Sequence, residues 1–244
     1  MSAHPIVSQD EWLAARKALL AREKEFTRAR DALSEARRRL PWRKVEKDYR
    51  FRTAEGERSL AELFEGHSQL LVYHFMFAPD WDGPCKSCSF WADSFNGIEP
   101  HLAARDVSFA AISRAPLDKL KKTAQRLGWG FRWVSSGGSD FNYDFGVSFT
   151  PEEIASGRVT YNYNSAHKAY GSDMPGVSVF YKDAGGTIFH TYSCFARGID
   201  TLNGAYNFLD LAPKGRDEAG LPYAMAWVRL NDEYAGAGRM EMAS

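Results

Sequence analysis

Large apolar residues recur at every seventh position near the start of the chain, namely Trp12, Leu19, Phe26, Leu33 and Leu40. Ser8 and Glu11 have the spacing of a capping box, and no Gly or Pro follows until Pro41. This pattern predicts one helix of about 32 residues, or about 48 Å at about 1.5 Å per residue. Its apolar stripe must pack against something, either the protein's own core or the same helix of a second subunit. A repeat sustained over this length favours a homodimer.

Apolar runs and helix-like segments alternate through the middle of the chain. Strands are expected at 49–52, 70–77, 107–113 and 131–135, and helices at 88–104 and 117–127. Between the first two strands, Ser59 and Gly66 are residue types that begin and end a short helical segment. Strands that alternate with helices of about ten to fifteen residues predict an α/β fold with a largely parallel central sheet.

Glycines and tyrosines punctuate residues 136–172, which predicts loops, with a lid among them. A hairpin is expected over 177–192, where two β-like runs flank a glycine turn, and a helix over 200–211. The predicted organisation is therefore an N-terminal helical arm (1–44), one α/β domain (45–213) and a C-terminal tail (214–244).

Composition narrows the class of protein. The longest uncharged apolar run, Leu70 to Ala78, is about half of the roughly 20 residues that a membrane-spanning helix needs, and the N-terminus lacks an apolar signal-peptide core. Three cysteines are too few for a secreted disulfide framework. We therefore expect a cytoplasmic protein that does not associate with membranes.

Charge is balanced overall, with 31 basic and 31 acidic residues, but residues 11–50 carry thirteen Lys or Arg against seven Asp or Glu. The basic residues of this arm are interleaved with acids and form no single stripe. A solvated helix face is the favoured interpretation, and no nucleic-acid partner is expected.

The candidate chemistry lies at Cys85-Lys86-Ser87-Cys88, between a buried strand and a helix-like segment. A thiolate is the attacking species in disulfide exchange, and a helix N-terminus together with the Lys86 ammonium would lower the pKa of Cys85. Cys85 is therefore the predicted nucleophile and Cys88 the resolving thiol. Asp80 and Asp82 precede the loop, and their negative charges would raise the pKa of Cys85, against the effect of Lys86. The sequence therefore leaves both directions of the net shift open.

Neighbouring residues admit two interpretations. Trp81 and Trp91 would narrow access to the dithiol as substrate-binding residues, with Lys86, or would act as core anchors. The alternative is a metal site, in which Cys85 and Cys88 would supply two ligands and His74 or His190 a further one. Both histidines lie in strand patterns, however, where core residues are more common than metal ligands.

The order of elements resembles the thioredoxin fold: a buried strand, C-x-x-C at a helix start, further βα units, then a proline, a hairpin and a helix. The segment 174–180 resembles the part of thioredoxins in which a cis-proline faces the disulfide, which implies that Pro175 is cis and contacts substrate. The strand–helix–strand over 107–135, followed by 144–147, is similar to the insertion found in peroxiredoxin-type members of that superfamily.

Several longer motifs resemble the bacterial DUF899 family, at 73–81, 88–97, 189–193, 196–198 and 202–206. This resemblance implies a dithiol–disulfide oxidoreductase of thioredoxin-like fold with no cofactor. Its substrate would be a disulfide-containing protein or a small thiol, and neither the sequence nor the resemblance identifies the electron donor. The alternative is a non-catalytic or metal-binding thioredoxin-like module.

This chain departs from the family pattern at three places. Pro84 precedes the first cysteine, Lys86 follows it, and Cys194 stands where the family usually has threonine. Cys194 is expected to be a buried small residue, with a third redox-active thiol as the alternative. A thiol peroxidase is disfavoured, because Ala78 and Asp82 occupy the places where peroxiredoxins carry proline and threonine or serine.

Overall fold

The computed structural model describes residues 4–168 and 170–234. The chain divides into two compact units, one that ends at Pro41 and one that begins at Trp42. The first unit contains helix α1, Gln9–Arg38, and the predicted capping box is present, since the Ser8 side chain accepts from Glu11 N–H and Glu11 reaches back to Ser8 N–H. The helix ends shortly before Pro41, as expected for the restricted backbone before a proline. The prediction of one long N-terminal helix is confirmed.

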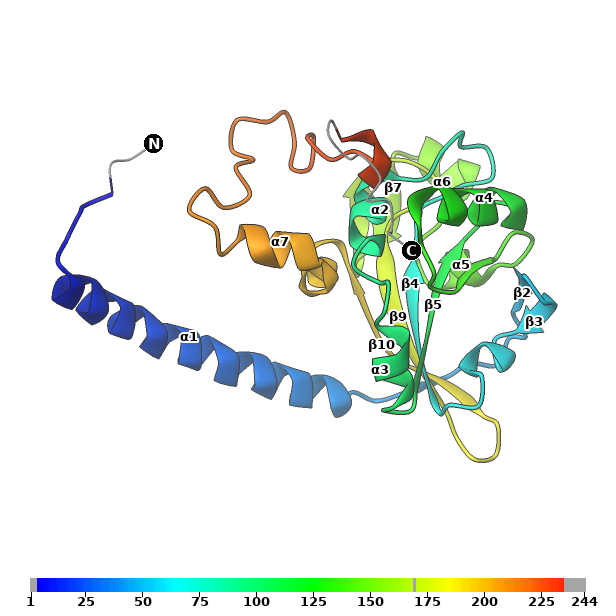
Figure 1. Cartoon of the computed structure of the whole chain (residues 1–244). Coiled ribbons are helices and arrows are strands. Elements are labelled where there is room, and N and C mark those ends of the chain that lie inside the picture. Colours follow the sequence, from blue (N-terminus) through cyan, green and yellow to red (C-terminus); the bar gives the residue numbers. More distant parts are fainter. Residues whose placement is uncertain (1–3, 169, 235–244) are drawn as a thin grey trace, which may run out of the picture. The chain divides into compact units, whose positions relative to one another are not determined.

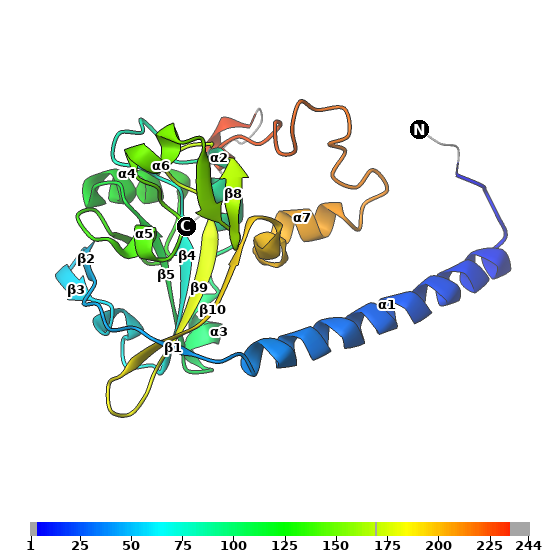
Figure 2. The ribbon, with the colours of Figure 1, turned by 180° about the vertical axis from the view of Figure 1, so that it is seen from behind.

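The second unit is built on an eight-stranded sheet in the order β1-β10-β9-β4-β5-β6-β2-β3 (Figures 1 and 2). The strands are β1 (Arg43–Lys44), β2 (Arg50–Thr53), β3 (Gly56–Ser59), β4 (Gln69–His74), β5 (Val107–Ser113), β6 (Trp133–Ser135), β9 (Gly176–Lys182) and β10 (Ile188–Phe195). Only the β4–β5 and β5–β6 ladders are parallel. The expectation of a largely parallel sheet is therefore wrong, because short turns join β2 to β3 and β9 to β10, and such turns can only connect antiparallel strands.

Short helices connect and cover these strands. They are α2 (Lys86–Ala92), α3 (Glu99–Ala103), α4 (Leu117–Leu127), α5 (Phe141–Asp144), α6 (Pro151–Ala155) and α7 (Gly204–Leu209), with 3-10 turns η1 (Glu62–Phe64), η2 (Ala196–Leu202) and η3 (Asn231–Glu233). A separate two-stranded hairpin is formed by β7 (Arg158–Tyr161) and β8 (Asn164–Lys168).

Three predicted elements differ from the structure. The helix expected at 88–104 is two helices, since Gly97 has a φ of 81° and Pro100 lies at the start of α3. The helix expected at 200–211 begins as η2 and is restarted at α7 by Asn203, whose side chain caps it. Residues 136–172 were expected to be loops but contain α5, α6 and the β7–β8 hairpin.

The arrangement of the central elements is thioredoxin-like. Strand β4 leads into α2, β5 lies parallel to β4 on one side, and the antiparallel hairpin β9–β10 lies on the other. The additional α4–β6 unit extends the sheet beyond β5, as in the predicted insertion. The predicted fold class, α/β and thioredoxin-like with a long N-terminal helix, is confirmed.

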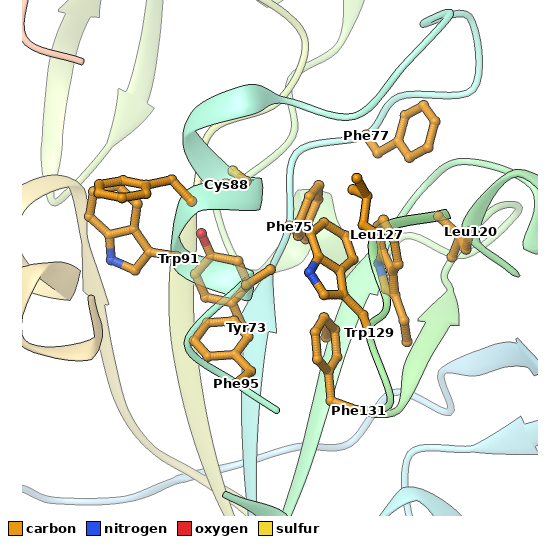
Figure 3. Packing of buried hydrophobic residues seen from close by; sticks show 14 of the residues in the cluster. Tyr73, Phe75, Phe77, Cys88, Trp91, Phe95, Leu120, Leu127, Trp129 and Phe131 are labelled. Atoms are coloured by element: carbon orange, nitrogen blue, oxygen red, sulfur yellow. The ribbon is translucent and has the colours of Figure 1, made fainter. Parts of the chain in front are cut away.

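Side-chain alternation along β4 divides the core between the two faces of the sheet. Tyr73 and Phe75 point to the face that α2 covers, while Val72 and His74 point to the opposite face. Figure 3 shows the first cluster, in which Tyr73 from β4 and Phe75, just after the strand, pack with other aromatic side chains beneath the helix that carries Cys88. The cysteine pair and the two strand histidines are therefore on opposite sides of the sheet.

The chain beyond α7 packs against α2. Val228 and Leu230 are buried in the same cluster as Cys88, and the Trp227 ring lies edge-on to Phe90 with a centroid distance of 5.4 Å. Figure 1 shows this segment in red beside α2. Met225, Trp227, Val228 and Leu230 therefore complete the core on the cysteine side. No helix in the described part of the chain is long and apolar enough to cross a membrane.

Candidate dithiol site

Cys85 is the N-cap residue of α2. Its backbone N–H donates to the Met76 carbonyl at 3.2 Å, which ties the cysteine loop to the end of β4. The Cys88 N–H donates to the Cys85 sulfur at 3.5 Å, and both cysteines are free thiols. A sulfur at this position receives the unpaired N–H groups of the first helical turn. The predicted strand-to-helix junction is therefore present, and the first cysteine caps the helix.

The two thiols have opposite pKa shifts. The Cys88 thiol interacts with Cys85 and, together with the backbone N–H groups of Cys88 and Ser87, lowers the pKa of Cys85 to about 7 against the opposing effect of burial. Burial and the neighbouring Cys85 raise the pKa of Cys88 well above its usual value. One cysteine is thus prepared to ionise and the other to remain a thiol, which is the asymmetry that disulfide exchange requires.

Tyr73 is a site residue that sequence analysis did not find. It is fully buried in β4, and its pKa is raised by burial first and then by Cys88, with which its hydroxyl interacts. The hydroxyl forms no complete hydrogen bond with any described residue. A neutral phenol therefore lies at the Cys88 thiol. The signal in the sequence was its alternation with Phe75, which places both side chains on the face that α2 covers.

The β7–β8 hairpin also reaches this region. The Tyr161 hydroxyl donates to the Pro175 carbonyl at 2.7 Å and accepts from Ala196 N–H at 2.9 Å. Burial raises the pKa of Tyr161, and Cys88 contributes to the shift. Residues 136–172 thus supply a buried side chain near Cys88, which the expectation of loops did not anticipate.

Lys86 lies beside the dithiol but points to the C-terminal segment. Its ammonium is 3.6 Å from a carboxylate oxygen of Glu233. The groups that lower the pKa of Cys85 are the Cys88 thiol, backbone N–H groups and the Ser87 hydroxyl. The helix N-terminus therefore has the predicted effect on Cys85, and the lysine side chain is engaged elsewhere.

The two tryptophans have different surroundings. Trp81 is half-buried and packs at the edge of the aromatic cluster, and the carbonyl of Trp81 accepts from Lys119 at 2.8 Å. Trp91 is 5% exposed, and its indole N–H donates to the Ile199 carbonyl at 2.9 Å. The structure gives Trp91 the position of a core anchor, and Trp81 that of a side chain at the margin of the cysteine loop.

The expectation that Pro175 follows a cis peptide bond is wrong. No cis bond occurs in the described residues, so the Met174–Pro175 bond is trans. The Pro175 carbonyl is occupied by Tyr161, as noted above. The argument that this proline presents a cis-proline edge to substrate therefore no longer holds, and we do not include Pro175 in the proposed site.

The residues considered for a metal site are separated by the sheet. His74 is buried on the face opposite the cysteines, and its Nε2 is 2.8 Å from Ser178 Oγ. His190 Nε2 is 2.7 Å from Ser193 Oγ. No group of three or more potential metal ligands occurs within residues 4–168 and 170–234. The core interpretation agrees with the position of His74, whereas His190 is half-buried.

Cys194 lies on the cysteine face, two strands away from Tyr73. The register pairs Tyr73 with Val177, and Val177 with Cys194, so the three residues form a row across β4, β9 and β10. Cys194 is half-buried and packs against the same cluster as Cys88. A third thiol is therefore present on the face of the dithiol.

These features define a thioredoxin-like protein with a C-x-x-C dithiol at the N-terminus of a helix. The chain belongs to the family described as a bacterial protein of unknown function (DUF899), whose model matches residues 1–234. No curated protein matches the chain.

Solved structures that resemble the chain include three peroxiredoxin-type proteins. Peroxidoxin BcpB from Mycobacterium tuberculosis is 15% identical, with 67% of this chain and 93% of that chain covered and a TM-score of 0.44. Peroxiredoxin Q from Xanthomonas campestris is 14% identical, with 64% and 87% covered and a TM-score of 0.43. A yeast mitochondrial 1-Cys peroxiredoxin is 15% identical, with 70% and 77% covered and a TM-score of 0.38.

Proposed function

We propose that this protein is a thiol–disulfide oxidoreductase in which Cys85 is the nucleophile and Cys88 the resolving thiol. The observation that carries the proposal is the opposite pKa shift of two thiols joined by one turn of helix, with the Cys85 pKa at about 7. A substantial fraction of Cys85 is then thiolate at neutral pH, while Cys88 keeps its proton until it is needed.

The reaction balances as a two-electron exchange. The Cys85 thiolate attacks one sulfur of a substrate disulfide, a mixed disulfide forms, and the other substrate sulfur leaves as a thiolate. Cys88 then loses its proton and attacks the Cys85 sulfur, which expels the second substrate thiolate and forms the Cys85–Cys88 disulfide. A thiol reductant returns the pair to the dithiol, and a reducing compartment such as the cytoplasm would supply one. The same steps in reverse would oxidise a substrate dithiol.

A peroxidase function has less support from the site. Asp82 lies three residues before Cys85, where a hydroxyl side chain would be needed to bind the peroxide oxygen. A carboxylate cannot donate a hydrogen bond to the peroxide, and it repels the negative charge that develops on the leaving oxygen. Exchange with disulfides is therefore the function we propose.

Equilibration of the purified protein with thiol–disulfide buffers of graded potential tests the proposal. We expect one reversible two-electron transition, detected as loss of two free thiols, that disappears in Cys85→Ser and in Cys88→Ser. Cys194→Ser is the matched control and should keep the transition. A wild-type protein with no reversible couple would refute the proposal, and stoichiometric bound zinc or copper in elemental analysis would support the metal-binding alternative instead.

A further inference from the structure

A pocket of about 270 Å³ lies on the face of the sheet opposite the dithiol. Its lining includes Arg43, Phe145, Tyr163, His190, Ser193 and Phe195. The register pairs His190 with Phe180 and Ser193 with Ser178, and all of these side chains belong to the second face. The pocket is therefore separate from the cysteine site, and its volume suits a molecule smaller than a drug-sized ligand.

The floor of the pocket is part of a buried hydrogen-bond chain. His190 Nε2 is 2.7 Å from Ser193 Oγ, Ser193 Oγ is 2.8 Å from Ser178 Oγ, and Ser178 Oγ is 2.8 Å from His74 Nε2. His190 Nε2 is also 3.0 Å from the Tyr192 carbonyl. Four polar side chains in the core of a sheet are costly to bury unless their hydrogen bonds are satisfied.

The Tyr192 carbonyl fixes the tautomer of His190. A carbonyl can only accept, so His190 Nε2 must carry a hydrogen. Ser193 Oγ then accepts from His190, and either serine can be the donor between Ser193 and Ser178. In both arrangements Ser178 occupies His74 Nε2, and the other ring nitrogen of His74 is Nδ1. That atom is buried and has no hydrogen-bond partner among the described residues. An unsatisfied group of this kind costs about 1–3 kcal/mol, so the network is not an optimum for stability.

The tautomer of His190 determines which of its ring atoms can bond to a ligand in the pocket. Burial, and then the nearby Arg43, lower the pKa of His190, which is therefore neutral at pH 7. With the hydrogen on Nε2, the lone pair of Nδ1 is the part of the ring that remains to accept a hydrogen bond. A ligand group at His190 must consequently be a donor.

Arg43 favours a ligand that also carries a negatively charged acceptor group. It lies directly across from His190 in the β1–β10 pairing, and its guanidinium is 5.6 Å from the centre of the Phe145 ring. Asp144 also lines the pocket and interacts electrostatically with Arg43, but its carboxylate is hydrogen-bonded to Lys47 at 2.8 Å and to Tyr49 at 2.7 Å. A planar guanidinium beside an aromatic ring matches a carboxylate on a flat molecule.

The rim of the pocket contains a strained turn. Asn162 and Tyr163 connect β7 to β8 with φ values of 51° and 61°, a conformation that favours Asn-Gly, and the second position here is a tyrosine. The Tyr163 hydroxyl donates to the Ser193 carbonyl at 3.0 Å, while the side chain stays 78% exposed. Together with Phe145 and Phe195, this tyrosine provides aromatic surface for a planar ring.

We propose that this pocket binds a small planar aromatic carboxylate that also carries a hydroxyl or N–H donor. Arg43 holds the carboxylate, His190 Nδ1 accepts from the donor, and the aromatic side chains enclose the ring. The proposal is independent of thiol exchange, because no residue of the pocket belongs to the dithiol site.

Titration calorimetry with para-hydroxybenzoate, benzoate and phenol tests this assignment. The first probe has both polar groups, and each of the others lacks one. We expect saturable binding of para-hydroxybenzoate, with each simpler probe about tenfold weaker for the loss of one hydrogen-bonded group. Arg43→Gln should weaken both acids about tenfold and leave phenol unchanged. His190→Phe should remove the advantage of para-hydroxybenzoate over benzoate.

The controls separate binding from folding. Arg50→Gln removes an exposed arginine outside the pocket and should leave all three affinities unchanged. The ¹⁵N shifts of His190 should show an unprotonated Nδ1 in the free protein. Absence of saturable binding by all three probes, or affinities that do not respond to Arg43→Gln in a folded protein, would overturn the proposal.

Discussion

The backbone N–H of Cys88 points at the Cys85 sulfur across 3.5 Å, so the second cysteine helps to ionise the first. Its thiol is also the largest cause of the lowered Cys85 pKa. The two cysteines therefore act as a unit, in which removal of the second thiol changes the chemistry of the first.

The pH dependence of alkylation measures this coupling. Iodoacetamide reacts with the thiolate, so we expect the rate at Cys85 to rise with a midpoint near pH 7, the pKa of this thiol. Cys88→Ala keeps the backbone N–H but removes the thiol, and should move the midpoint toward the ordinary pKa of 9.0. Cys194→Ala should leave it unchanged. A midpoint that is the same in wild type and Cys88→Ala would contradict the coupling.

Tyr73 is expected to assist the second half of the exchange. Its raised pKa keeps the phenol protonated, so its hydroxyl can only donate to a Cys88 thiolate. A hydrogen bond to a charged group contributes about 1.5–3 kcal/mol, and Tyr73→Phe should therefore slow attack by Cys88 about tenfold or more. An aromatic disulfide that releases a coloured thiolate at each step resolves the two phases by stopped flow.

The control for this experiment uses the same chemical change elsewhere. Tyr181→Phe, on β9, should leave both phases unchanged. Tyr73→Phe should slow the second phase only, and its stability should equal or exceed that of wild type because a buried unsatisfied hydroxyl is lost. Equal slowing of both phases would indicate a general disturbance of the site and refute the assigned role.

Local signals in the sequence were sufficient for several elements. Helix α4 has the predicted bounds, Leu117–Leu127, because Pro116 precedes it and Gly128 ends it with a φ of 72°. Strand β5 is also as predicted, since a continuous apolar run buried on both faces needs no further information. Both cysteines of the candidate site follow from spacing at a strand-to-helix junction.

Other features depend on partners that are distant in the sequence. Strand β1 is two residues long and exists because β10 pairs with it. The position of Tyr73 at Cys88 depends on which face of β4 the helix covers, and the pairing of Lys86 with Glu233 depends on how the last residues return to α2. Such contacts have no local signature. Thr150-Pro151-Glu152-Glu153 was a readable capping box, and its helix was missed within a glycine-rich region.

Acid should destabilise the protein through its buried histidine. Burial lowers the pKa of His74 from 6.5 to about 3, so below pH 6.5 the unfolded chain binds a proton that the folded chain does not. The stabilising contribution is complete above pH 6.5 and is lost as the pH falls toward 3, at about 1.4 kcal/mol per pH unit. Urea unfolding at pH 7, 6 and 5 measures this slope, and His74→Gln should reduce it. An unchanged slope in that variant would contradict the assignment.

The C-terminal segment is expected to stabilise the dithiol helix. Leu230 is 5% exposed and belongs to the cluster that contains Cys88. Leu230→Ala should lower the free energy of unfolding by about 2–4 kcal/mol and increase alkylation of Cys88 in the native state. Leu211→Ala removes an 85% exposed leucine and should change neither quantity. Thermal unfolding and mass spectrometry of the alkylated protein provide the two measurements.

The apolar stripe of α1 predicts a homodimer. No residue of this helix is buried, and large side chains at the heptad positions are exposed, including Trp12 (53%), Phe26 (70%) and Leu33 (54%). An apolar stripe of this length is costly to leave in water, and a second copy of the same helix would cover it.

Charges beside the stripe favour a parallel, in-register pair. In a parallel, in-register pair, the residue that precedes each large apolar residue of the stripe lies opposite a residue of the partner helix whose number is five higher. Glu11 would then face Arg16, and Glu25 would face Arg30, and each contact would occur twice by symmetry. The positions three residues after the large apolar ones hold Ala15, Arg22, Ala29 and Ala36. Arg22 would bring two cations together in the seam, which weakens the pair.

Sedimentation equilibrium of the full chain tests this arrangement with opposite substitutions. Phe26→Glu places charges in the seam and should give monomers, whereas Arg22→Leu removes the repulsion and should tighten the dimer by about tenfold or more. Lys24→Glu lies on the outer face of the helix and should have little effect. A wild-type monomer at all concentrations, or a dimer unaffected by Phe26→Glu, would refute the pairing, and a monomer in which these side chains are protected would assign the stripe to the protein's own core.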